Sequence, residues 1–157
     1  MAALLALDAD ALAELVTRNV AIKAAVVMAD EKETGVRATL NFGHTFAHAI
    51  EAVSGYGVIL HGEAVALGML AASTLAASIG LCSAGLRDEL EALVAAAGLA
   101  VRARLPDDER LLEAMALDKK VVHARIRFVL PTRLGAVELR DDLEPAAIRA
   151  AWASIRN

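Results

Sequence analysis

The spacing of apolar residues along the chain predicts a mainly helical fold. Between residues 8 and 28, apolar side chains recur every three or four positions, which is the spacing of one helix face. Residues 86–97 repeat this pattern, and Gly98 supplies a helix stop. The longest apolar stretch, residues 64–80, is rich in alanine, carries three hydroxyl residues and is shorter than the roughly 20 residues of a membrane span. We therefore expect a buried central helix there, from about residue 62 to 79.

One segment has the composition of β-strands. Residues 125–140, RIRFVLPTRLGAVELR, contain two β-prone runs on either side of a turn with Pro131 and Gly135. A helix should precede this hairpin, beginning near Pro106, and another should follow it, from Pro145 to about Ile155. Because no repeat or linker interrupts the pattern, we expect residues 1–157 to form one mainly α domain with a small β-hairpin at about 125–140.

Composition and charge narrow the possible partners and the cellular compartment. The formal net charge of −4 gives no broad positive field, so neither nucleic acid nor an anionic membrane is expected as a partner. The apolar N-terminus lacks a basic start and soon reaches Asp8 and Asp10, which argues against a signal peptide. The lone Cys82 rules out an internal disulfide framework and fits a reducing compartment. We expect a cytoplasmic protein.

Two histidines lie four residues apart in LNFGHTFAHAIE, residues 40–51. On a helical wheel His44, His48 and Glu51 fall within about 60° of one another, on the side opposite the apolar positions. Two imidazoles with this spacing can bind one metal ion, or they can be surface or capping residues. The zinc-protease pattern is excluded, because Thr45 stands where that pattern needs glutamate.

His61 lies just before the predicted central helix, where its side chain can project into a cleft or simply cap the helix. Lys23 falls inside the first apolar stripe, so its stem either covers that stripe or carries a cation into an enclosed anion site. If a helix starts near Asn41, then Arg37 and Asn41 crowd its N-terminal end, which would be a natural anion site.

The pair Lys119 and Lys120 follows Asp118 and forms either a second local basic group or a solvated helix end.

Three segments together resemble, in order and spacing, the C-terminal domain of the 3-dehydroquinate synthase family. They are residues 22–51, LHGEAVALGM at 60–69 and LDKKVVHARIRFVLPTRLG at 117–135. The resemblance implies a sugar-phosphate cyclase, the second enzyme of the shikimate pathway of aromatic amino acid biosynthesis. This lyase converts 3-deoxy-D-arabino-heptulosonate 7-phosphate to 3-dehydroquinate and phosphate, using NAD and a divalent metal, Zn²⁺ or Co²⁺.

Carried over position by position, the resemblance implies roles for individual residues. His44 and His61 become two metal ligands, while His48 and Lys23 become catalytic residues that also contact the substrate. The other implied substrate-binding residues are Arg37, Asn41 and one or both of Lys119 and Lys120, near the phosphate.

The resemblance also implies an N-terminal NAD-binding domain that supplies the glycine-rich nucleotide site and a glutamate as third metal ligand. No part of these 157 residues matches it, and GYG at 55–57 lacks the third glycine and the preceding strand of a dinucleotide fingerprint. We therefore expect the metal- and substrate-binding half of a two-domain enzyme, nearly inactive alone and prone to homo-oligomerise through the uncovered surface. The alternatives are another sugar-phosphate cyclase and a non-catalytic helical interaction module.

Overall fold

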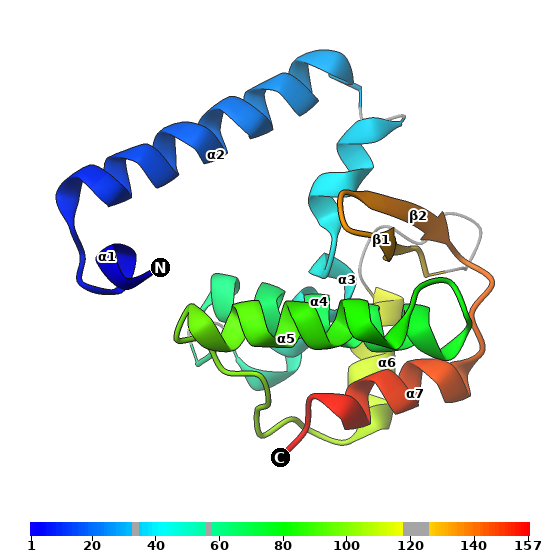
Figure 1. The fold of residues 1–157 in the computed structure, drawn as a ribbon. Coiled ribbons are helices and arrows are strands. Elements are labelled where there is room, and N and C mark those ends of the chain that lie inside the picture. The colour runs from blue at the N-terminus through cyan, green and yellow to red at the C-terminus, as the bar shows by residue number, and fades with distance from the viewer. Residues whose placement is uncertain (33–34, 56–57, 118–125) are drawn as a thin grey trace.

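The computed structural model describes residues 1–32, 35–55, 58–117 and 126–157, and it is mainly helical (Figure 1). The elements in chain order are α1 (Ala2–Leu5), α2 (Ala9–Ala29), the 3-10 helix η1 (Val36–Asn41), α3 (His44–Ser54), α4 (His61–Ser78), α5 (Ala84–Ala96), α6 (Asp108–Leu117), β1 (Phe128–Arg133), β2 (Ala136–Arg140) and α7 (Pro145–Ser154). This order confirms the predicted helical fold with a small hairpin.

Helix α4 lies at the centre of the domain, as its apolar sequence predicts. Most of its residues are buried, and α3, α5, α7 and β1 all pack against it. Its many alanines allow these neighbours to approach closely. The one buried hydroxyl side chain of α4, Ser73, donates a hydrogen bond to the carbonyl of Met69 at 2.8 Å, so the helix backbone satisfies it.

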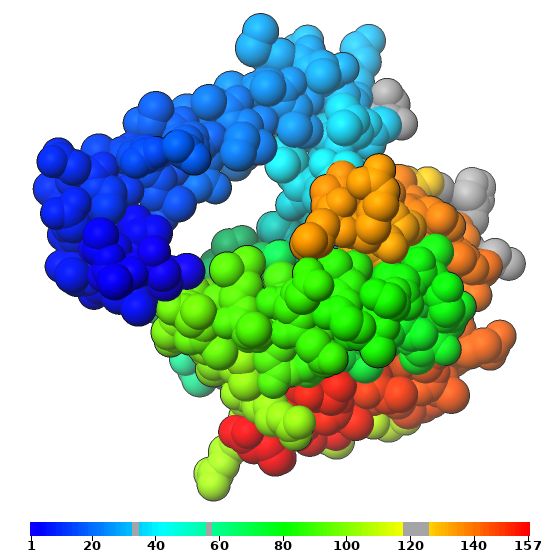
Figure 2. Space-filling model, viewed as in Figure 1, coloured from blue at the N-terminus to red at the C-terminus, as the bar shows by residue number. Residues whose placement is uncertain are grey.

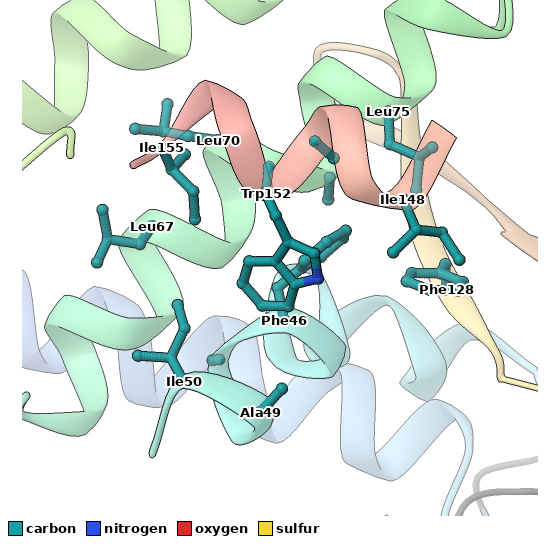
Figure 3. Close-up of a cluster of buried hydrophobic side chains, with 14 of the residues drawn as sticks. Phe46, Ala49, Ile50, Leu67, Leu70, Leu75, Phe128, Ile148, Trp152 and Ile155 are labelled. Carbon is teal, nitrogen blue, oxygen red and sulfur yellow. The ribbon is translucent and has the colours of Figure 1, made fainter. Parts of the chain in front are cut away.

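Three aromatic side chains join the elements around α4 (Figure 3). Phe46 of α3 lies edge-to-face against Trp152 of α7, with ring centroids 4.8 Å apart, and its centroid is 5.5 Å from that of Phe128 in β1. All three rings are buried. The apolar side of α3 is therefore fixed against β1 and α7, and its other side is left for polar residues.

The two strands pair in antiparallel register, from Phe128 opposite Arg140 to Arg133 opposite Ala136. Gly135 adopts φ +76° in the connecting turn, a conformation that glycine tolerates better than other residues. The predicted hairpin is thus confirmed over residues 128–140.

Helices α1 and α2 form an arm that meets the rest of the molecule at its two ends, through η1 and through Leu5 beside Gly98. Asp8 caps α2, accepting a hydrogen bond from the backbone of Ala11 at 2.9 Å, but no residue of α2 is buried. The helix contacts chiefly η1 and α1, and Figure 2 shows an opening between it and the body. The predicted helix is confirmed, yet its apolar stripe is not buried: its middle is exposed, with Val20 at 61%, and Leu12, Val26 and Val27 near its ends are half-buried.

Among the described residues, the helices lack the combination of length and apolarity that crossing a bilayer requires.

Candidate metal centre

The histidine helix begins at His44, three residues later than the anion-site interpretation assumed. Residues 36–41 form the 3-10 helix η1, and Gly43, at φ +82°, separates it from α3. A left-handed residue at this point turns the chain, so Asn41 ends one helix instead of starting the next. A helix start near Asn41, the condition under which Arg37 and Asn41 would crowd the N-terminal end of the histidine helix, is therefore not met.

The start of α3 lies against the middle of α4 through a contact between two glycines. A Cβ built on Gly68 would lie 2.1 Å from the carbonyl oxygen of Gly43, so only a hydrogen fits between the two backbones. The hydroxyl of Thr45 donates a hydrogen bond to the carbonyl of Arg127 at 2.9 Å, which ties the same turn to the segment before β1. These contacts fix where the side chain of His44 emerges.

Three imidazole rings gather at the starts of α3 and α4. The centroid of the His44 ring is 5.7 Å from that of His48 and 5.5 Å from that of His61. Zinc binds imidazole nitrogen at about 2.0–2.1 Å, which places the centres of two rings sharing one ion about 5 Å apart. The distances from His44 to either neighbour thus fit a pair of ligands to one divalent cation.

Hydrogen bonds at the rings of His44 and His61 indicate which nitrogen of each is available to bind a metal. Nδ1 of His44 lies 3.3 Å from the carbonyl oxygen of Phe42, and Nδ1 of His61 lies 3.1 Å from Oε1 of Glu51. Carbonyl and carboxylate oxygens only accept, so both contacts require a hydrogen on Nδ1. In a neutral ring, Nε2 then carries the lone pair that a metal needs.

Two imidazoles alone do not complete a metal site. Within residues 1–32, 35–55, 58–117 and 126–157, no group of three or more His, Cys, Asp or Glu side chains is placed to hold a metal ion. Cys82 offers no substitute, because burial raises the pKa of its thiol and disfavours the thiolate that binds metals.

The other residues expected at the site are more dispersed. Lys23 is exposed on α2, and the guanidinium of Arg37 donates a hydrogen bond to the carbonyl of Glu31 at 2.7 Å. Asn41 is half-buried at the end of η1, three residues before His44. Lys119 and Lys120 lie outside the described residues.

Sequence reasoning assigned no role to Glu51, although its helical-wheel position placed it beside His44 and His48. The structure shows its carboxylate to be the partner of His61. The sequence feature that could have pointed to this role was the position of Glu51: a carboxylate on the histidine face of the helix, one turn beyond His48.

The family model and the relatives that match this chain agree with one another. Residues 1–121 match the family model described as 3-dehydroquinate synthase C-terminal. A 3-dehydroquinate synthase from Pseudomonas fluorescens is 51% identical over 152 residues, covering 94% of this chain and 41% of that protein. Another from Synechococcus sp. is 44% identical over 154 residues, covering 96% of this chain and 41% of that protein. The chain spans about two fifths of the length of these relatives.

Solved structures share the fold. A 2-epi-5-epi-valiolone synthase from Streptomyces hygroscopicus, with NAD⁺ and Zn²⁺ bound, has a TM-score of 0.80 at 23% identity, covering 94% of this chain and 41% of that one. A 2-deoxy-scyllo-inosose synthase complexed with carbaglucose-6-phosphate, NAD⁺ and Co²⁺ has a TM-score of 0.65, also at 23% identity, covering 78% of this chain and 35% of that one.

Proposed function

Because the chain belongs to the 3-dehydroquinate synthase C-terminal family, we propose that it is the metal- and substrate-binding half of a 3-dehydroquinate synthase. The complete enzyme would convert 3-deoxy-D-arabino-heptulosonate 7-phosphate to 3-dehydroquinate and phosphate. The observation that carries this proposal is the gathering of His44, His48 and His61 within the segment that matches the family. Identities of 44–51% to 3-dehydroquinate synthases favour this activity over that of the cyclases at 23%.

His44 and His61 would hold the divalent metal, Zn²⁺ or Co²⁺, through their Nε2 atoms. Their ring separation of 5.5 Å and their Nδ1 partners support this assignment. A metal bound there supplies Lewis acidity toward substrate oxygen atoms. A third ligand from the remainder of the enzyme would complete the coordination.

His48 would then act on the substrate and not on the metal. It lies on the same side of α3 as His44, one helical turn further on, where its imidazole can take up and return a proton. Lys23, Arg37 and Asn41 would bind the carboxylate and hydroxyls of the substrate, and Lys119 or Lys120 its phosphate. Several fixed contacts to one small anion hold it in place while protons move.

The partner we propose for the arm is an NAD-binding domain that precedes this segment in the complete enzyme. The exposed apolar residues of α2 support such a contact, as does a largely apolar groove of about 800 Å³ between η1, α4, α5 and the hairpin. NAD would bind mainly to that domain. Left uncovered, the same surface would favour self-association of the chain, consistent with a homo-oligomer.

Joining this chain to the preceding part of the Pseudomonas fluorescens relative should restore turnover. With NAD and Zn²⁺ or Co²⁺, the fusion should release phosphate from 3-deoxy-D-arabino-heptulosonate 7-phosphate and form 3-dehydroquinate, identified by mass spectrometry. The 157-residue chain alone should release none, because in this proposal NAD binds mainly to the preceding domain. Replacing His48 with glutamine in the fusion should slow turnover about a hundredfold or more, since a proton-transfer group is lost.

The same fusion tests the alternative cyclase activity. A folded fusion that binds NAD and metal yet releases phosphate only from another sugar phosphate would contradict the proposed substrate. One that releases no phosphate from any sugar phosphate would favour a non-catalytic helical module.

A further inference from the structure

Glu51 and His61 form a contact between the histidine helix and the central helix. Glu51 lies on the second turn of α3, and His61 is the first residue of α4. Oε1 of Glu51 is 3.1 Å from Nδ1 of His61, and the carboxylate side chain is 16% exposed, against 58% for the imidazole. The carboxylate is thus largely enclosed, while the ring it contacts reaches into the open.

We propose that Glu51 is a positioning residue for the metal site, holding the His61 ring with hydrogen on Nδ1 so that Nε2 is the metal-binding atom. This inference rests on the proposed function, which makes His61 a ligand. Glu51 itself touches neither metal nor substrate in this arrangement.

The physical argument follows from what the carboxylate can and cannot do. A carboxylate only accepts, so this hydrogen bond selects one of the two tautomers that a neutral imidazole otherwise populates. It also limits rotation of the ring and makes the opposite nitrogen a stronger donor to a cation. His61 needs such a restraint more than His44, because both begin a helix but the side chain of His61 is largely exposed, whereas His44 is half-buried.

The contact supports His61 as the second ligand beside His44. The rings of His61 and His48 lie at comparable distances from His44, 5.5 and 5.7 Å, so distance alone does not choose between them. A carboxylate behind the ring is the usual support of a metal-bound histidine, and Glu51 supplies it to His61.

The first measurement, the tautomer of the His61 ring, needs no metal. In the 157-residue chain at about pH 8.5, where an ordinary imidazole is neutral, long-range ¹H–¹⁵N NMR should show His61 as the Nδ1–H tautomer. Glu51→Ala should convert it to a mixture of tautomers. Glu51→Gln, which keeps an accepting oxygen, should retain part of the Nδ1–H population. An unchanged His61 tautomer in Glu51→Ala would overturn the proposal.

The second readout is the affinity for Zn²⁺, followed through the imidazole C–H signals. Glu51→Ala should weaken Zn²⁺ binding about 10–100-fold, and Glu51→Gln by less. Glu63→Gln is the matched control. Glu63 lies two residues from His61 and accepts a hydrogen bond from the backbone of Leu60 at 2.8 Å, so this variant removes the same charge without touching the imidazole. It should leave both readouts unchanged.

A further variant separates this inference from the proposed function. If His61→Ala weakens Zn²⁺ binding and Glu51→Ala does not, the positioning role is overturned and the proposed ligand stands. If His61→Ala leaves Zn²⁺ affinity unchanged, both fail. An equal loss in Glu63→Gln and Glu51→Gln would assign the effect to overall charge and would also overturn the positioning role.

Discussion

Replacing Gly68 with alanine should lower the free energy of unfolding by about 3 kcal/mol, the upper part of the range for overpacked cores. The added Cβ would stand 2.1 Å from the carbonyl oxygen of Gly43 and 3.1 Å from the backbone nitrogen of Ala47. These two atoms form the first hydrogen bond of α3, at 3.0 Å. The substitution must therefore separate α3 from α4 or break that bond, despite the higher helix propensity of alanine.

Gly62→Ala is the matched control for this experiment. Gly62 lies in the same helix, and a Cβ added there meets no atom within 4 Å among the described residues. Urea unfolding followed by circular dichroism should show a much lower midpoint for Gly68→Ala and an unchanged or slightly raised one for Gly62→Ala. Equal midpoints would show that the two backbones do not approach as closely as described. Because the contact sets the position of His44, Gly68→Ala should also weaken Zn²⁺ binding.

Removing the indole of Trp152 should lower the free energy of unfolding by about 3–5 kcal/mol, as expected for a buried tryptophan truncated to alanine. Its side chain is 0% exposed and packs on Phe46 (Figure 3). On the helical wheel, Phe46 lies on the opposite side of α3 from the histidines. Loss of the ring would leave α3 without support from α7. The measurement is again urea unfolding by circular dichroism, since Trp152 is the only tryptophan and its fluorescence is lost.

Trp152→Phe provides the comparison that isolates packing. Within the described residues the indole Nε1 is buried without a hydrogen-bond partner, so phenylalanine removes no hydrogen bond and leaves a smaller cavity than alanine. It should cost clearly less stability than Trp152→Ala. Equal losses would mean that the contact with Phe46 contributes little.

The spacing of apolar residues predicted where helices form and which of their faces are apolar, because both depend on residues close together in the chain. The helical wheel of residues 44–53 separated Phe46, Ala49, Ile50 and Val53 from the histidines. The structure buries the first three and half-buries Val53 against the core. The same reasoning predicted the stripe of α2 but not its exposure, because periodicity identifies an apolar face without naming the surface that covers it.

The site was predictable in its residue types and less so in its contacts. The resemblance brought His44, His48 and His61 together, and the family match confirms the relationship on which it rests. The contact between Gly43 and Gly68 joins residues far apart in the chain, and the Glu51–His61 contact depends on how two helices meet. Neither can be read from spacing along one helix.

The measurement closest to the central claim is zinc anomalous diffraction from crystals of the 157-residue chain soaked in Zn²⁺. We expect one ion within about 2.0–2.1 Å of Nε2 of both His44 and His61. Zinc bound between His44 and His48, or held through Nδ1 of either proposed ligand, would contradict the account.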